Sequence, residues 1–190
     1  TLRSKEKTEE FHLAIAGKHN VMNATAAIIV ARECRISTEE IKAGLEKFFG
    51  TKRRMEFIGT TKEGALVYDD YAHHPTEIRT SLEGLREKYP QRKIVCIFQP
   101  HTYSRTKQLF EEFSSSFSDA DVIVLPDIFP SAREAIDTTV SSKQLAESIR
   151  NYGKEVFHIA SLQDVIQYLN GQNYGDDTVI VTMGAGDVYT

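Results

Sequence analysis

The stretch Asp69-Asp70-Tyr71-Ala72-His73-His74-Pro75 brings together residue types that carry out acid–base chemistry and hold polar ligands. Two carboxylates, a phenol and two imidazoles follow an apolar run at 65–68 and precede a helical pattern that begins near Thr76. In an open α/β sheet, ligands bind just beyond the carboxyl end of a strand, where such a turn lies. Pro75 supports this interpretation because proline suits the first turn of a helix. Taken alone, the adjacent histidines are equally typical of an ordinary polar loop.

Four predicted strands end in polar or glycine-rich loops. In chain order these loops contain the Asp70 turn, His101 with Arg105, Asp127 with Arg133, and Gly184-Ala185-Gly186. Parallel strands release such loops at one edge of the sheet, so the pattern predicts a site for an anionic ligand that carries phosphate or carboxylate. Each loop also has a simpler explanation, because surface pairs four residues apart, loop ion pairs and glycines in tight turns are common structural features.

Apolar runs alternate with helical patterns beyond residue 50. The runs predict strands at 55–59, 65–68, 94–98, 122–125, 156–159 and 178–182, and the patterns predict helices at 76–89, 104–117, 142–151 and 161–170. The first two strands are expected to pair through the polar turn that joins them. Most later strands are apolar on both faces, which is typical of a parallel sheet covered by helices on each side. The predicted fold class is therefore α/β, with a mostly parallel sheet and helices on both faces.

Residues 1–50 contain fewer elements. They predict a charged hairpin loop, one strand and two helices, at Lys5–Glu10, Phe11–Ile15, Val21–Arg32 and Ser37–Phe49. Ser37 and Glu40 have capping-box spacing, and Gly50 is expected to close the second helix. So few elements cannot bury a convincing core of their own. We expect them to be the end of a preceding domain, joined by a linker at 51–54, in a chain cut from something longer.

Asn20 and Asn23 lie three residues apart at the start of the first predicted helix, so their side chains share one side of its first turns. One interpretation is an asparagine helix cap followed by an incidental polar residue. The other is a pair of amides for an adenine ring, because an amide can donate to and accept from the edge of adenine. The residues alone leave both interpretations open.

The composition is ordinary for a globular protein, with 41% hydrophobic and 26% charged residues among 190. The formal net charge of −4 argues against a general nucleic-acid or membrane-surface binder, because both of those partners are acidic. No run approaches the roughly 18 apolar residues that span a bilayer, and we expect no secretory leader. We expect a cytoplasmic protein that acts as a monomer or weak homodimer.

Metal and thiol chemistry have little support. Cys34 and Cys96 lack metal-ligand spacing and are expected to be two buried, reduced thiols without a disulfide. His73 and His74 suggest zinc, but no other residue has ligand spacing for it, so no metal site is predicted. The sequence contains no nucleophile elbow and no P-loop of the form GxxxxGK[ST].

Five motifs together resemble the bacterial Mur ligases of peptidoglycan synthesis. They are Gly17-Lys18-His19-Asn20-Val21-Met22-Asn23-Ala24, Arg53-Arg54-Met55-Glu56, Asp69–Glu77, Phe98–Thr106 and Met183–Asp187. The resemblance covers nearly the whole chain. It implies that residues 1–50 are the end of a central ATP-binding domain and that 51–190 are a C-terminal Rossmann-like domain whose last helix is truncated. The P-loop and the Mg²⁺ ligands of such an enzyme are then expected outside this chain.

The resemblance also implies roles for eight residues. Asn20 and Asn23 match the asparagines that hold adenine, Asp70 the aspartate that binds the ribose of ATP, and Arg54 the arginine directed at its phosphates. Tyr71, His73, His101 and Arg105 match residues around the sugar nucleotide and the incoming amino acid, and Arg54 and His73 are expected to act in catalysis. Some family members have a second arginine where this chain has Thr102, which removes a charge contact there.

The implied reaction is the activation of a carboxylate. The branch of the family that this chain most resembles phosphorylates the lactyl carboxylate of UDP-N-acetylmuramate with ATP, and the amine of L-alanine then attacks the acyl phosphate. Such chemistry depends mostly on positioning and on charge neutralisation. We expect the 190-residue piece to be inactive alone. Two alternatives stay open: a ligase that attaches a murein tripeptide in cell-wall recycling, and a nucleotide-binding module that performs no chemistry.

Overall fold

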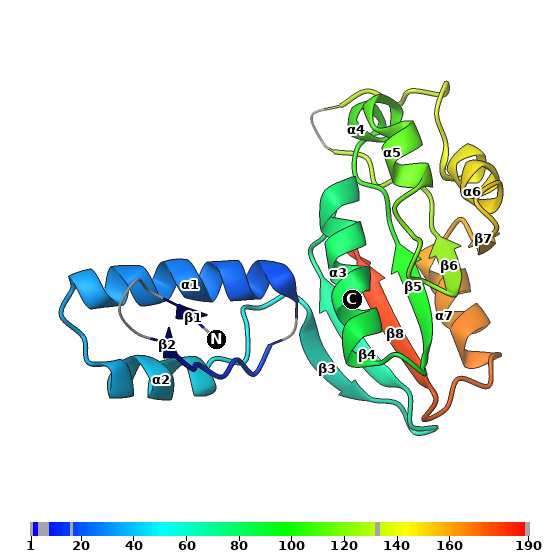
Figure 1. Ribbon diagram of the computed structural model, residues 1–190. Helices are drawn as coiled ribbons and strands as arrows, with labels where there is room; N and C mark the ends of the chain where they lie inside the picture. The colour runs from blue at the N-terminus through cyan, green and yellow to red at the C-terminus, as the bar shows by residue number, and fades with distance from the viewer. Residues whose placement is uncertain (1, 4–7, 16, 132–133, 189–190) are drawn as a thin grey trace. The chain divides into compact units, whose positions relative to one another are not determined.

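The computed structural model describes residues 2–3, 8–15, 17–131 and 134–188 (Figure 1). The chain divides into two compact units, Thr1–Thr51 and Lys52–Thr190. That the first unit is the end of an ATP-binding domain stays a prediction. No helix among the described residues is both long enough and apolar enough to cross a bilayer.

The first unit contains two short strands and two helices. Strand β1 (Leu2–Arg3) pairs antiparallel with β2 (Thr8–Glu9), and helices α1 (Lys18–Glu33) and α2 (Thr38–Glu46) follow. The hairpin loop predicted at Lys5–Glu10 lies partly outside the described residues. The strand predicted at Phe11–Ile15 is wrong, because these residues pair with no strand in the described part of the unit. The Phe11 ring instead lies 5.8 Å from the charged groups of both Arg32 and Lys42.

Helix α2 begins as predicted and ends early. The Ser37 hydroxyl accepts from the Glu40 backbone at 3.3 Å, and the Glu40 carboxylate accepts from the Ser37 backbone at 3.1 Å, which completes the capping box. The helix ends at Glu46, so Gly50 does not close it and Phe49 is 79% exposed. Ile41 is its one buried residue, so little apolar contact holds a further turn.

The two cysteines differ in their surroundings. Cys96 is buried in the larger unit, as expected, and burial raises the pKa of its thiol far above the usual range. Cys34 is exposed, contrary to the prediction, because it caps the end of α1 and the chain turns away at Arg35 with a φ of 62°.

The second unit is built on a six-stranded sheet. Its strands are β3 (Glu56–Thr60), β4 (Leu66–Asp70), β5 (Lys93–Phe98), β6 (Val122–Leu125), β7 (Glu155–His158) and β8 (Thr178–Met183). Their order in space is β3-β4-β8-β5-β6-β7. Only the β3–β4 hairpin is antiparallel, and every other neighbouring pair is parallel. The predicted mostly parallel α/β fold is confirmed.

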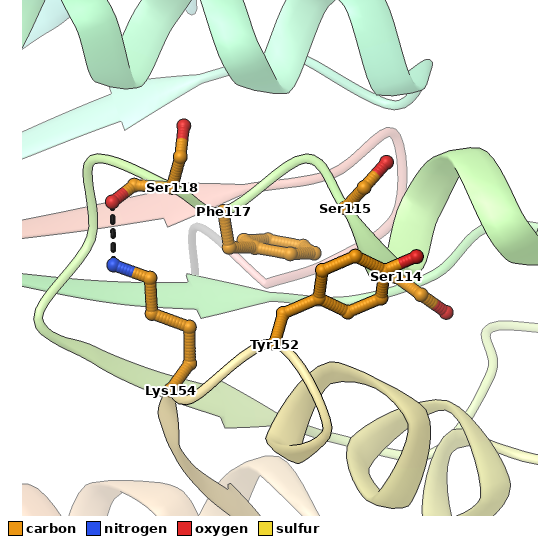
Figure 2. A pocket seen from close by; sticks show the side chains of 6 residues that line it. All are labelled: Ser114, Ser115, Phe117, Ser118, Tyr152 and Lys154. Carbon is orange, nitrogen blue, oxygen red and sulfur yellow. Dashed lines mark hydrogen bonds between the residues drawn. The ribbon is translucent and has the colours of Figure 1, made fainter.

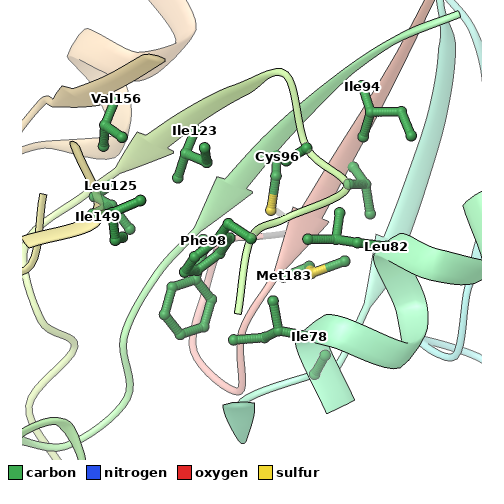
Figure 3. Packing of buried hydrophobic residues seen from close by; sticks show 14 of the residues in the cluster. Ile78, Leu82, Ile94, Cys96, Phe98, Ile123, Leu125, Ile149, Val156 and Met183 are labelled. Carbon is green, nitrogen blue, oxygen red and sulfur yellow. The ribbon is translucent and has the colours of Figure 1, made fainter. Parts of the chain in front are cut away.

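The sheet is covered by helices on each face. They are α3 (Pro75–Lys88), α4 (Tyr103–Gln108), α5 (Phe110–Ser114), α6 (Ser142–Arg150) and α7 (Leu162–Asn170). Alternate strand residues point to opposite faces. Thus Cys96 packs with residues of α3, α5 and α6 in one buried cluster (Figure 3), whereas Val95 and Ile97 pack with Val165 of α7 in another.

The helix predicted at Ser104–Phe117 is two helices. Helix α4 ends at Gln108 and α5 begins at Phe110, with Leu109 between them at φ −111° and ψ 26°. This bend places Phe113 and Phe117 against Phe98 in the buried cluster, with ring centroids 5.4 and 5.5 Å away. Local periodicity did not reveal the break because the apolar spacing continues across it.

Substitution of Leu82 tests how much the packing of α3 on the sheet contributes to stability. Its side chain is fully buried in the cluster shown in Figure 3. Leu82→Ala is expected to lower the free energy of unfolding by about 2–5 kcal/mol, through lost burial and a cavity. Its exposed neighbour offers the control, since Glu83→Gln should change that free energy by less than about 0.5 kcal/mol in the same urea titration. Equal effects of both substitutions would contradict this account of the core.

Candidate functional site

The carboxyl end of β4 carries two buried aspartates. Asp69 and Asp70 are each 3% exposed and form the last two residues of the strand, rather than the turn in which the sequence placed them. One Asp70 oxygen accepts from the Ala72 backbone at 3.0 Å and the other from the Ser81 hydroxyl at 2.7 Å. Burial raises the pKa of Asp70 although these hydrogen bonds and Arg54 oppose the shift. Asp70 therefore ties strand, turn and α3 together.

Arg53 connects three segments around Asp69. Its Nε donates to the Asp69 carboxylate at 3.0 Å, and its Nη2 donates to the Gly184 carbonyl at 2.7 Å. The other Asp69 oxygen accepts from the Thr182 hydroxyl at 2.7 Å. Arg53 thus anchors the start of the unit to the ends of both β4 and β8. Sequence reasoning singled out Arg54 and missed this residue, and two adjacent arginines carry no signal that tells them apart.

Tyr71 lies beside both arginines. The guanidinium carbons of Arg53 and Arg54 are 4.9 and 5.9 Å from the centre of its ring, within cation–π range. The His73 ring meets Tyr71 edge-on, with centroids 5.2 Å apart. Tyr71 is 37% exposed. The turn therefore presents an aromatic ring with two cations beside it, which suits an anionic ligand that also has a flat group.

The two adjacent histidines have different roles. His74 caps α3, because its Nδ1 accepts from the Thr76 backbone at 3.2 Å. His73 directs its Nδ1 to the Tyr71 carbonyl at 2.9 Å, a contact in which the ring nitrogen donates. Glu77 completes the capping box by accepting from both histidine backbones, at 3.0 and 3.1 Å. The helix cap thereby fixes the position of His73.

The loop after β5 holds the other predicted substrate residues. The His101 ring stacks on Phe129, with centroids 5.5 Å apart and planes 14° from parallel. Burial lowers the pKa of His101, and the charges of Arg105 and His73 lower it further, which outweighs Glu134. His101 Nδ1 and Arg105 Nη1 are buried polar atoms with no hydrogen-bond partner among the described residues. Such atoms are costly unless a ligand or water satisfies them, so they are candidates for contact with a ligand.

Thr102 starts α4 in a strained backbone conformation. Its φ is 71° with ψ 139°, a region that β-branched residues rarely adopt. Its N–H donates to the Phe129 carbonyl at 3.0 Å, and its hydroxyl accepts from the Arg105 backbone at 3.4 Å. Where a second arginine was considered, this chain therefore has a helix cap. The cap holds the Arg105 backbone at the start of α4.

The glycine loop after β8 packs closely against the β5 and β6 loops. A Cβ on Gly184, whose φ is 149°, would lie 2.9 Å from the Gln99 carbonyl. A Cβ on Gly186 would lie 2.8 Å from the Phe129 ring and 3.1 Å from Gln99 Oε1. Gly186 therefore leaves room for the ring on which His101 stacks. Phe129 and Gln99 were not singled out from the sequence, since apolar or neutral loop residues give no local signal of such contacts.

The loop after β6 contains the two remaining predicted residues, Asp127 and Arg133. Asp127 lies 2.7 Å from His158 Nε2, at the end of β7, and so has a partner that the sequence did not suggest. Arg133 lies outside the described residues. Glu134 accepts from the backbones of Tyr103 and Ser104 at 2.7 and 2.8 Å and holds this loop over the start of α4.

Asn20 and Asn23 both lie on α1, in the first unit. Gly17 is the N-cap of this helix, so the interpretation of Asn20 as its cap is wrong. The three-residue spacing within a helix keeps the two amides on one side. Their assignment to adenine stays a prediction.

One surface cavity lies away from these loops. It has a volume of about 270 Å³ and is lined by Ser114, Ser115, Phe117, Ser118, Tyr152 and Lys154 (Figure 2). Lys154 donates to the Ser118 and Ala120 carbonyls at 2.5 and 3.0 Å. These segments precede β6 and β7, so the cavity lies at the opposite edge of the sheet. Among the described residues, no group of three or more His, Cys, Asp or Glu side chains is arranged to hold a metal ion.

Comparison with known proteins identifies the larger unit. The family model "Mur ligase, glutamate ligase domain" matches residues 53–186. The chain belongs to the Mur ligase family. The match contains the loops after β4, β5 and β8 described above, and the resemblance noted in the sequence motifs is confirmed.

Individual relatives narrow the comparison within the Mur ligase family. UDP-N-acetylmuramate–L-alanine ligases from Desulfitobacterium hafniense and Clostridium acetobutylicum are 48% and 45% identical over 95% and 98% of this chain. The solved UDP-N-acetylmuramate–alanine ligase of Thermotoga maritima superposes with a TM-score of 0.80 at 30% identity, over 96% of this chain and 38% of that one. A murein peptide ligase from Psychrobacter arcticus gives 0.62 at 30% identity, over 96% and 37%. The chain spans about 40% of the length of these curated relatives.

Gly186 tests the packing of the glycine loop. Gly186→Ala forces the Phe129 ring to move, and we expect the free energy of unfolding to fall by about 1–3 kcal/mol. Gly171→Ala is the matched control in the same unit, because Gly171 has a φ of −82° and its nearest neighbour would lie 3.4 Å from the new Cβ. That substitution should change the free energy by less than about 0.5 kcal/mol in urea unfolding. Two equal losses would show that Gly186 has no special packing role.

His101 predicts a pH effect on stability. The folded protein binds a proton at His101 less readily than the unfolded chain, so acidification favours unfolding at this group. The stability due to neutral His101 is complete above its unfolded pKa of about 6.5 and is lost as the pH falls through the lowered folded pKa. Between pH 7.5 and 5.5, wild type should lose more unfolding free energy than His101→Gln. The other titrating groups are shared, so equal losses would refute this environment for His101.

Proposed function

We propose that this chain is the C-terminal part of an ATP-dependent ligase that joins L-alanine to the lactyl carboxylate of UDP-N-acetylmuramate. The reaction would supply a precursor of peptidoglycan in the cytoplasm, where ATP and sugar nucleotides are available. The observation that carries the proposal is the 48% identity to a UDP-N-acetylmuramate–L-alanine ligase over 95% of this chain. Because the chain covers 40% of that relative, the activity is proposed for the full-length gene product.

The nucleotide is proposed to contact four residues. Asn20 and Asn23 would hold the adenine edge, Asp70 the ribose and Arg54 the phosphates. The side chain of Arg54 is 53% exposed and has one weak ion-pair distance, 3.4 Å to Glu77, so it is available to an anion. Asp70 already holds the turn through both oxygens, and a carboxylate oxygen can accept a further hydrogen bond from a ribose hydroxyl.

The sugar nucleotide and the amino acid are proposed to bind at the neighbouring loops. Tyr71 offers an aromatic face, and Arg105 offers a buried nitrogen that has no hydrogen-bond partner among the described residues. A carboxylate or phosphate would satisfy that nitrogen. His101 is held neutral by its surroundings and can donate or accept, while His73 is placed by the α3 cap. We assign catalytic roles to Arg54 and His73, through charge stabilisation and proton transfer.

The proposed reaction has two bond exchanges. A carboxylate oxygen of the substrate attacks the γ-phosphorus of ATP, which forms an acyl phosphate and releases ADP. The neutral amine of alanine then attacks the acyl carbon, the C–O bond to phosphate breaks, and the amine loses a proton as the amide forms. Negative charge moves between oxygens in both steps, so arginines placed beside it lower the barriers. Mg²⁺ would neutralise the phosphates and is proposed to bind to the remaining part of the full-length protein.

A second candidate uses the same sugar nucleotide with a different acceptor. The solved murein peptide ligase from Psychrobacter arcticus is 30% identical and gives a TM-score of 0.62. This observation supports a ligase that attaches a murein tripeptide during cell-wall recycling. The higher TM-score of the alanine ligase, 0.80, favours alanine as the acceptor.

ADP release by the full-length gene product tests the proposal. Assays contain ATP, Mg²⁺ and UDP-N-acetylmuramate, with either L-alanine or the murein tripeptide, and mass spectrometry of the product confirms the new amide. We expect the full-length protein to turn over with alanine as acceptor and not with the tripeptide. We expect no turnover from the 190-residue chain, which contains no GxxxxGK[ST] motif. Turnover with tripeptide alone would assign the protein to recycling. Nucleotide binding without ligation of either acceptor would support a non-catalytic module.

A further inference from the structure

Glu77 contacts residues that the proposed function assigns to two different ligands. Its Oε1 lies 3.4 Å from Arg54 Nη1, on the proposed nucleotide side, and its Oε2 lies 3.5 Å from His73 Nδ1, on the proposed acceptor side. We infer that Glu77 is a positioning residue that holds Arg54 until a polyphosphate displaces it and that holds the His73 ring through its Nδ1. The inference rests on the proposed function of the same site.

One oxygen of the Glu77 carboxylate is held in place by hydrogen bonds. Its Oε2 accepts from the backbones of His73 and His74, at 3.0 and 3.1 Å, as part of the α3 capping box. Moving this oxygen away would leave two N–H groups at the start of the helix without their acceptor. The carboxylate therefore keeps its place when its other partners change.

The carboxylate also keeps its charge. Burial raises the pKa of Glu77, but the hydrogen bond from the His73 backbone and the positive charges of His73 and Arg54 outweigh it, and the net shift is downward. Glu77 is consequently ionised at neutral pH. The same carboxylate oxygen, Oε2, lies 3.5 Å from the His73 ring nitrogen, so its fixed negative charge can hold that ring in place.

Arg54 is held much less firmly than its neighbour Arg53. Arg53 donates to Asp69 and to the Gly184 carbonyl, at 3.0 and 2.7 Å, and its partner Asp69 has a side chain only 4% exposed. The pair of Arg54 with Glu77 is longer, and the two side chains are 53% and 33% exposed. Exposed pairs of this kind are weak, so a polyphosphate with several negative charges can displace one carboxylate. Arg54 is thus the arginine that can change partners.

A purely structural role for Glu77 makes a different prediction. If Glu77 only capped α3, glutamine would serve nearly as well, because its amide oxygen can accept the same two backbone hydrogen bonds. If Glu77 holds Arg54 by its charge, Glu77→Gln frees Arg54 and strengthens anion binding. The capping role therefore predicts no change in anion affinity, whereas the holding role predicts a gain.

The test is a titration of the 190-residue chain with inorganic tripolyphosphate. Binding is monitored through the side-chain NMR signal of Arg54. We expect Glu77→Gln to bind about two- to fivefold more tightly than wild type, the range set by an exposed ion pair. Glu83→Gln removes the same charge from an exposed position on the same helix and should leave the affinity unchanged. In an Arg54→Ala background the gain from Glu77→Gln should vanish. Equal affinities, or no binding to either protein, overturn the inference for Arg54.

Kinetics of the full-length ligase test the effect on His73. Glu77→Gln is expected to lower kcat roughly tenfold without raising the KM for ATP, since the charge that supports His73 is lost and Arg54 is released. An unchanged kcat would remove the role at His73, because glutamine serves nearly as well as glutamate in a residue that only caps α3. If wild type shows no ligase turnover, the proposed function fails, while the tripolyphosphate titration still decides whether Glu77 holds Arg54.

Discussion

The position of strand β8 is the constraint on which the site depends. Among the described residues this strand comes last in sequence, yet it lies between β4 and β5 and is hydrogen-bonded to both. Its register sets Met183 opposite Asp70 on one side and opposite Phe98 on the other. Three strands therefore end level with one another. The Tyr71 turn, the His101 loop and the glycine loop leave the sheet from that common line, which is why residues over 100 positions apart become neighbours.

This arrangement divides the ionic contacts into fixed and exchangeable ones. Arg53 and Asp69 join the β4 and β8 ends, and the Asp69 carboxylate is almost fully buried, so separating them would leave a buried charge unpaired. Arg54 and Glu77 lie nearer to solvent, where water replaces either partner at little cost. Two adjacent arginines thus serve different ends. Arg53 maintains the geometry of the edge, and Arg54 is the arginine that we propose exchanges its partner for a ligand.

Sequence patterns predicted features set by neighbouring residues, such as single strands and helix caps. They missed features that depend on which elements pack or pair with one another. The strand predicted at residues 122–125 has the same bounds as β6, because a short apolar run between turns indicates a buried strand in an α/β pattern. The capping box of α2 is equally local. The order of the strands cannot be predicted locally, since nothing within residues 178–183 indicates which strands they will pair with. Phe11–Ile15 shows the converse, because alternation without a partner strand does not make a strand. The break at Leu109 is set by contacts with the sheet.

The same limit applies to the site. Residue types at the Asp70 turn pointed to chemistry, but side-chain partners followed from the fold: Asp70 meets Ser81 in the second turn of α3, and His101 meets Phe129 from another loop. The two histidines make the point sharply. Neighbours in sequence with the same side chain, they separate because the backbone at a strand-to-helix turn sends one into the cap and the other toward Tyr71. The position of each side chain at this edge is therefore set by backbone direction, and the capping Glu77 helps to fix that direction through the backbones of His73 and His74.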